Sequence, residues 1–167
     1  MPQTTKSRSR RLPTTEQLLV WRAITETSEI IRSRAGSQLQ QGAGLSTGDY
    51  QVLLALSEAP GARLRPSEIA DTINWQRSRL SHHIGRMEKR GLVAREECLD
   101  DSRGSEVVLT SEGSRAFRAG SIPHLETVRE LFIDALSDEQ LSQVEELMAT
   151  LRDHLELPEI SGVIRSD

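Results

Sequence analysis

The 167-residue sequence has few of the features that mark secreted, membrane-bound or β-rich proteins. Its single cysteine, Cys98, excludes an internal disulfide, and its 3% of aromatic residues favours helices over a β-sandwich. The longest unbroken apolar run, residues 52–56, is far shorter than the roughly 20 residues of a membrane-spanning helix. The first twenty residues lack the apolar segment of a secretory signal. We therefore expect a cytoplasmic protein without membrane contacts.

The net charge of −4 would by itself argue against a nucleic-acid partner, but the charges are unevenly distributed. Residues 1–11 carry four bases and no acid, residues 63–95 carry eight bases against three acids, and residues 124–167 carry eleven acids against three bases. A basic middle and an acidic end are expected when one face meets a polyanion and another does not. A solvated, arginine-rich helix would give the same distribution, so charge alone leaves both interpretations open.

Apolar spacing and capping residues predict one mainly helical domain. Residues 1–13 are polar and basic and are expected to form a disordered tail, and residues 158–167 are expected to form a frayed one. Between them, residues 14–157 are predicted to form a single domain that begins with a long helix over about 15–41. A capping box that starts at Ser46 predicts the second helix.

The next stretch predicts two helices joined by a tight turn. Pro66 and Glu68 are favourable at a helix N-terminus, and Asn74 tolerates the left-handed conformation that ends a short helix. A second helix is predicted over 77–90, and Gly91 ends it. Two helices with this separation are typical of a helix-turn-helix.

Beyond this point the apolar period changes from helical to alternating. Short strands are predicted at 92–96 and 106–109, and together they form a β-hairpin, or wing. Thr110 then starts a helix that Pro123 should kink or interrupt, and a capping box at Ser137 starts the last helix. The predicted fold class is therefore mainly α with a small β-hairpin wing (α+β).

The helix predicted over 77–90 has two chemically different faces. Leu80, Ile84 and Met87 form one narrow apolar stripe, and Glu88 lies near its flank. The opposite face has no carboxylate, whereas a solvated helix face normally mixes charges of both signs. Bases, hydroxyls and imidazole can donate to phosphates and to guanine in the major groove. With flanking positions, the candidate DNA-contacting residues are Arg65, Gln76, Arg77, Ser78, Arg79, Ser81, His82 and Arg86.

The hairpin tip suggests a second DNA contact. Asp101 is close enough in sequence to constrain Arg103, which would then project beside a glycine into the narrow minor groove. A surface turn with an incidental ion pair is the alternative.

Several runs of this sequence, in this order and spacing, resemble the MarR family of multiple-antibiotic-resistance-type regulators. They are LRPSEIA at 64–70, SRLSH at 78–82, MEKRGLV at 87–93, DSRG at 101–104 and LTSEG at 109–113. The resemblance implies a winged helix-turn-helix over about 45–110 and a homodimer built by helices over about 15–41 and 110–156. It also implies double-stranded DNA as partner, with Arg103 in the minor groove, and repression at a pseudo-palindromic operator. A small phenolic or anionic effector would release the DNA.

One residue departs from the family's pattern, and three others lie at positions of the family's effector pocket. Arg65 stands where relatives often have a capping Thr or Ser, and we expect its guanidinium to be free for a phosphate. Trp21, Arg22 and Tyr50 lie where relatives have the walls of the effector pocket, although aromatic residues at helical spacing are also typical of a plain core.

Other functions were weighed on the same residues. Oxidation of Cys98 beside the wing is one alternative, but the surrounding acids disfavour the thiolate that redox sensing requires. His82 and His83 point about 100° apart on a helix and are poorly placed to share a metal. We find no catalytic constellation and expect no cofactor and no enzymatic activity. A winged helix that contacts only proteins is the remaining alternative, and it would not need a carboxylate-free helix face.

Overall fold

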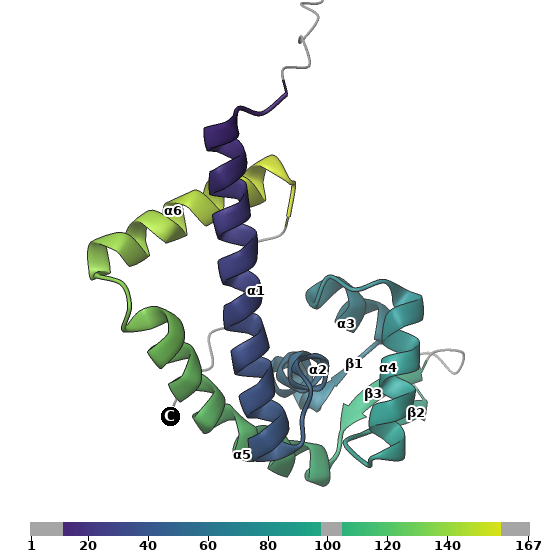
Figure 1. Cartoon of the computed structure of the whole chain (residues 1–167). Coiled ribbons are helices and arrows are strands. Elements are labelled where there is room, and N and C mark those ends of the chain that lie inside the picture. The colour runs from purple at the N-terminus through teal and green to yellow at the C-terminus, as the bar shows by residue number, and fades with distance from the viewer. Residues whose placement is uncertain (1–11, 98–104, 158–167) are drawn as a thin grey trace, which may run out of the picture.

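The computed structural model describes residues 12–97 and 105–157 (Figure 1). Residues 1–11 of the predicted basic tail, the hairpin tip with Cys98, Asp101 and Arg103, and the predicted C-terminal tail lie outside the described residues. In chain order the elements are α1 (Thr15–Ala43), α2 (Thr47–Glu58), η1 (Pro60–Ala62), β1 (Arg63–Leu64), α3 (Pro66–Thr72), α4 (Arg77–Lys89), β2 (Val93–Glu97), β3 (Ser105–Leu109), α5 (Ser111–Val128), η2 (Arg129–Ile133) and α6 (Asp138–His154).

Side-chain caps and left-handed residues set the helix ends. Reciprocal capping boxes start α2 at Ser46 and α6 at Ser137, as predicted, and a further one starts α1 at Thr14. The predicted left-handed conformation at Asn74 is confirmed by its φ of 53°, and Gly91, with φ of 73°, follows α4. These local signals place the elements within a few residues of the predicted boundaries.

Pro123 does not interrupt α5, so of the two predicted effects, a kink or an interruption, the interruption is wrong. The helix runs unbroken from Ser111 to Val128 and becomes irregular only at η2, a π-helical turn closed by a 2.9 Å hydrogen bond from Asp134 N to Arg129 O. Proline removes only one backbone hydrogen bond. α5 packs against α1 and α2, and these tertiary contacts outweigh the local cost of the proline.

The three strands form one antiparallel sheet in the order β1–β3–β2. The predicted hairpin is confirmed: Val93 pairs with Leu109 and Arg95 with Val107. β1 adds Arg63 opposite Val108 on the other edge of β3 and was not predicted. A two-residue strand is too short to show an alternating pattern, so the sequence carries little signal for it.

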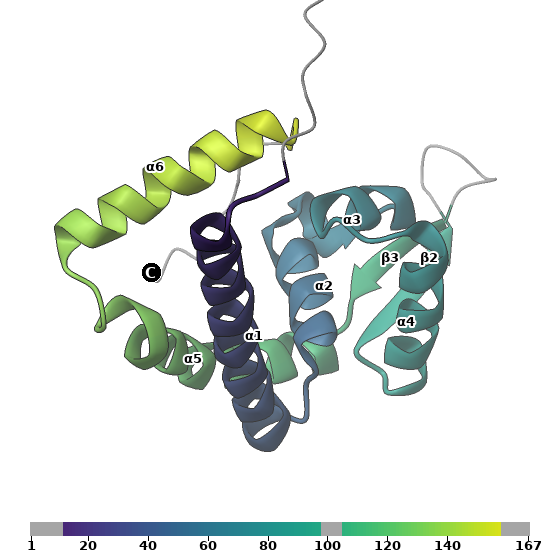
Figure 2. The same ribbon diagram turned by 45° about the horizontal axis from the view of Figure 1, so that its top comes forward.

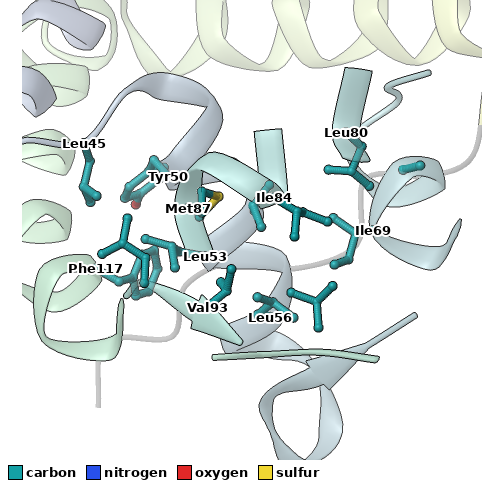
Figure 3. Close-up of a cluster of buried hydrophobic side chains, with 14 of the residues drawn as sticks. Leu45, Tyr50, Leu53, Leu56, Ile69, Leu80, Ile84, Met87, Val93 and Phe117 are labelled. Atoms are coloured by element: carbon teal, nitrogen blue, oxygen red, sulfur yellow. The ribbon is translucent and has the colours of Figure 1, made fainter. Parts of the chain in front are cut away.

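The apolar core lies between α2, α3, α4 and the sheet, a unit that we call the α2–β3 lobe. Leu53, Leu56, Ile69, Leu80 and Ile84 are among its fully buried side chains (Figure 3). This core fixes the position of α4, because the whole apolar stripe of that helix is turned into it.

The first half of α1 and the whole of α6 lie outside this lobe, and we call these two segments together the helical base. α6 lies away from the α2–β3 lobe in both views (Figures 1 and 2). Apolar side chains of the base are exposed, and they are Leu18, Leu19, Val20, Trp21, Ile24, Ile30, Leu147, Met148, Leu151 and Leu155. Within the described part of the chain, no helix is long and apolar enough to cross a membrane.

Candidate nucleic-acid interface

α3, the turn at Asn74 and α4 form the predicted helix-turn-helix. α3 starts with Pro66 in its first turn, and Glu68 Oε2 accepts a 2.7 Å hydrogen bond from the backbone N–H of Arg65. α4 begins after Gln76 and ends at Lys89, one residue before the predicted end. The two helices pack against each other, and α4 also packs on α2 and β2.

The two faces of α4 are as predicted. Leu80, Ile84 and Met87 are buried, and Glu88 is half-buried beside them, with Oε2 3.2 Å from Arg95 Nε. The outward positions are all exposed, and they are Gln76, Arg77, Ser78, Arg79, Ser81, His82, Arg86 and Lys89. The exposed face of α4, which is described along its whole length, therefore has bases, hydroxyls and an imidazole but no carboxylate.

The basic excess of residues 63–95 is only partly available to a ligand. Arg63 Nη1 lies 3.5 Å from Glu96 and 3.4 Å from Glu106 across the sheet, and Arg95 pairs with Glu88. Arg65 is exposed and also has an interaction within the chain, and its contact with a phosphate stays a prediction. The charge that faces outward is concentrated on α4.

Arg79 is held against an aromatic ring. Its guanidinium carbon lies 3.9 Å from the centroid of the Trp75 ring, in cation–π geometry. Trp75 is half-buried and packs against the core of the α2–β3 lobe, so it is a fixed support.

A buried polar network lies behind α4, and no local sequence pattern indicated it. Asp49, 3% exposed, has Oδ2 2.7 Å from Arg90 Nη1 and Oδ1 3.0 Å from His83 Nε2. The backbone N–H of Ser46 also donates to Asp49 Oδ2, and Arg90 Nη2 donates to the carbonyl of Gly44 at the end of α1. The network thus joins the α1–α2 junction to α4.

The sequence contained only part of the signal for this network. Asp49 was predicted as a capping residue, and that role is confirmed, but its partners are 34 and 41 positions away in sequence. Burial would raise the pKa of Asp49, yet interactions with His83, Arg90 and Ser46 outweigh burial and hold that pKa well below its usual range. Asp49 is therefore a buried, paired carboxylate.

The three residues predicted to line an effector pocket, Trp21, Arg22 and Tyr50, do not lie together in the folded structure of one chain. Trp21 is 66% exposed and Arg22 pairs with Glu26 on the same exposed turns of α1. Tyr50 is buried, with its ring 4.6 Å from that of His124, and burial raises the Tyr50 pKa and lowers the His124 pKa. Leu39 of α1 belongs to the same core as Tyr50. At the usual helical rise, Trp21 lies about 27 Å along α1 from Leu39, so Trp21 is far from Tyr50 within one chain.

A separate open groove of about 620 Å³ lies where α1 meets the start of α2. The residues that line it are mostly of polar or charged types and include Arg32, Gly36 and Gln40 of α1 and Ser46 and Thr47. Within residues 12–97 and 105–157, no cluster of His, Cys, Asp and Glu side chains is arranged to hold a metal ion.

A helix-turn-helix followed by an antiparallel hairpin on the same core defines a winged-helix protein. Residues 43–104 match the sequence profile described as MarR family. The structure is similar to AbsC, a MarR family transcriptional regulator from Streptomyces coelicolor, with a TM-score of 0.82 and 36% identity over 87% of this chain and 98% of AbsC.

Two further relatives agree with this placement. Sco3205, a MarR family transcriptional regulator from Streptomyces coelicolor solved in complex with DNA, gives a TM-score of 0.81 and 38% identity over 86% of this chain and 94% of Sco3205. Transcriptional repressor MprA of Escherichia coli (strain K12) is 25% identical over 158 residues, which are 95% of this chain and 88% of MprA. The chain belongs to the MarR family of transcriptional regulators.

Proposed function

We propose that the chain is a sequence-specific, double-stranded-DNA-binding repressor of transcription that reads the major groove with α4. The observation that carries this proposal is the exposed, carboxylate-free face of α4, fixed in place by the buried stripe of Leu80, Ile84 and Met87. A face of fixed donors suits both phosphates and the acceptor atoms of guanine. Its relative Sco3205 binds DNA in a solved complex, which supports the same use of the fold here.

The side chains of α4 divide by chemistry into two roles. Arg79 and Arg86 are the guanine readers, because a guanidinium donates in bidentate fashion to O6 and N7. Arg77 and Lys89, near the two ends of the helix, contact phosphates. The remaining donors of this surface are Gln76, Ser78, Ser81 and His82. Arg65 for a phosphate, and Arg103 with Asp101 for the minor groove, stay predictions.

We further propose that two copies associate through the helical base. Trp21 and Leu147 are 66% and 61% exposed and belong to apolar rows on α1 and α6 that a single chain leaves uncovered. Exposed apolar surface of this extent marks an interaction site. Because a two-fold dimer presents two α4 helices, its operator is a pseudo-palindrome with half-sites about one helical turn apart.

A small-molecule effector that releases the DNA completes the proposal. The groove where α1 meets the start of α2 is a concave site among the described residues, and Ser46, one of its lining residues, also bonds to Asp49 behind α4. A phenolic or anionic molecule remains the expected class of effector, and its pocket residues stay a prediction. This role implies a cytoplasmic protein that acts by binding and not by catalysis.

The test is a comparison of two arginine variants that change the charge equally. An operator is first selected from a random pool of duplex DNA with the full chain, and affinities are then measured by fluorescence anisotropy at fixed salt. Arg86→Ala should weaken operator binding by about 1–3 kcal/mol, whereas Arg118→Ala on exposed α5 should leave it nearly unchanged. Equal losses in both variants, or no loss in either, would contradict the assignment of α4.

A further inference from the structure

His83 is the one imidazole of α4 that is turned away from the surface, and the proposed DNA contacts do not use it. The residue is 8% exposed, whereas its neighbour His82 is exposed. Its Nδ1 lies 2.8 Å from Nη2 of Arg86, and its Nε2 lies 3.0 Å from Oδ1 of Asp49. A buried histidine thus stands between a buried carboxylate and an exposed arginine.

The chemistry of these partners fixes where the proton of the imidazole lies. A guanidinium has donors only, so Nδ1 of His83 must accept from Arg86. The proton of the neutral ring is therefore on Nε2, which lies 3.0 Å from the Asp49 carboxylate but outside hydrogen-bond geometry, so the contact is one between a charge and the N–H dipole. Asp49 is itself held by Arg90 and by the N–H of Ser46, so the ring orientation is set from the α1–α2 junction.

The second arginine of the same face is supported next to this ring. Trp75 meets His83 edge to face, with ring centroids 5.1 Å apart and an interplanar angle of 83°, and the guanidinium of Arg79 lies over the Trp75 ring. Arg79, His83 and Arg86 are spaced four and three residues apart and so lie along one side of α4. Both exposed arginines therefore rest on rings that contact each other.

We propose that His83 is a positioning residue for DNA recognition, which holds the guanidinium of Arg86 in its reading orientation through Nδ1 while Asp49 fixes the ring. This inference rests on the proposed function, because Arg86 must contact the operator for its orientation to matter. An unsupported arginine loses rotamer freedom when it binds, so support before binding raises affinity. We expect a gain of about two- to tenfold from one ordered side chain.

The device requires the neutral ring. A second proton would occupy Nδ1, remove the acceptor for Arg86 and place two cations side by side. The groups that face the ring are Asp49 of α2, Arg86 of α4 and the uncharged Trp75 of the turn after α3. The charged residues of the other packed elements are engaged elsewhere or exposed: Arg95 of β2 on Glu88, Glu68 at the N-terminus of α3, and Asp71 in solvent.

A double-mutant cycle tests the proposal on the full chain with its selected operator. His83→Gln keeps a donor near the Nε2 position for Asp49 but removes the acceptor at the Nδ1 position. It should weaken binding by about two- to tenfold at about pH 8, and adding it to Arg86→Ala should cause no further loss. The exposed neighbour is the matched control, because His82→Gln should add its own loss to that of Arg86→Ala.

The outcomes separate the inference from the function on which it rests. If Arg86→Ala binds as wild type, the proposed use of α4 fails. If Arg86→Ala weakens binding but His83→Gln adds its full loss to it, α4 still reads DNA and the positioning role of His83 is overturned. Thermal unfolding of each variant shows that the compared proteins are folded.

One readout responds to positioning but not to a packing role. His83→Asn places a carbonyl oxygen near the Nδ1 position and should recover part of the affinity lost in His83→Gln, and failure to recover any would overturn the acceptor role.

Discussion

In the α2–β3 lobe the large apolar side chains are buried, whereas along the first half of α1 and along α6 they face outward. Leu56 and Ile84 of the lobe are fully buried, but Trp21 and Leu147 of the helical base are 66% and 61% exposed. The lobe therefore gains its stability within one chain, and the base has apolar surface left for a partner. Substitutions of the same kind in the two regions should report on different equilibria.

The largest effect is expected from a cavity in the lobe. Leu56→Ala removes a fully buried side chain and should lower the free energy of unfolding by about 2–5 kcal/mol. Leu18→Ala, at a position that is 51% exposed, should change it by less than about 0.5 kcal/mol under dilute conditions. Urea denaturation measured at low protein concentration compares the two, and similar losses would remove the distinction between lobe and base.

A substitution in the helical base should weaken dimerisation. Leu147→Ala should weaken dimerisation by up to about 3 kcal/mol, because each of two chains loses about 1.5 kcal/mol of apolar burial. Sedimentation equilibrium over a range of concentrations measures the dissociation constant. Ser142→Ala, an exposed polar position on the same helix, is the control. A wild-type chain that stays monomeric at micromolar concentration would contradict the proposed dimer.

Much of this comparison was accessible from the sequence, because its signals are local. The capping boxes at Ser46 and Ser137, the left-handed turn at Asn74 and the stripe of α4 all depend on residues a few positions apart. Contacts across the fold were not accessible. Nothing near Asp49 in sequence indicates that Arg90 neutralises it and that His83 lies beside it.

The difference between local signals and contacts across the fold also explains where the sequence-based predictions were wrong. Helical continuity at Pro123 is a property of the whole fold, in which α5 packs against α1 and α2, so the residues around the proline did not indicate it. Pairing of Arg63 with Glu96 and Glu106 across the sheet likewise reduced the basic surface that a count of charges suggested. The prediction of an exposed face of α4 without carboxylates is confirmed, because the positions on that face follow from helix geometry alone.

Charge removal at the buried network should cost less than a lobe cavity and should depend on pH. Asp49→Asn keeps the shape of the side chain but leaves Arg90 without its anion, and we expect a loss of roughly 1–3 kcal/mol at pH 7. The folded-state pKa of Asp49 is lowered, so the stability that its ionisation provides is present above about pH 4 and is lost as the pH falls further.

Denaturation curves at neutral and at acidic pH measure this dependence. The difference between wild type and Asp49→Asn should narrow below about pH 4. Asp153→Asn, an exposed change on α6 of the base, should show little difference at either pH. A constant gap between wild type and Asp49→Asn across this range would show that shape and not charge accounts for the loss.

The smallest effect on stability, and the sharpest on the lobe's function, is expected at Gly48 in the first turn of α2. A Cβ atom there would lie 2.7 Å from Cη2 of Trp75 and 3.0 Å from Cε1 of His83, so both rings must shift to admit Gly48→Ala. The gain of up to about 1 kcal/mol in helix propensity offsets the cost of that shift, and unfolding should change little. DNA affinity should still fall severalfold, because Arg79 and Arg86 contact those rings.

Gly42→Ala on α1 is the control. The new Cβ there would meet only Gln38 Nε2 at 3.5 Å, so this variant should gain stability and keep its affinity. The prediction would be contradicted if Gly48→Ala gained as much stability as Gly42→Ala and bound its operator as tightly as wild type. The two rings would then shift without disturbing Arg79 and Arg86.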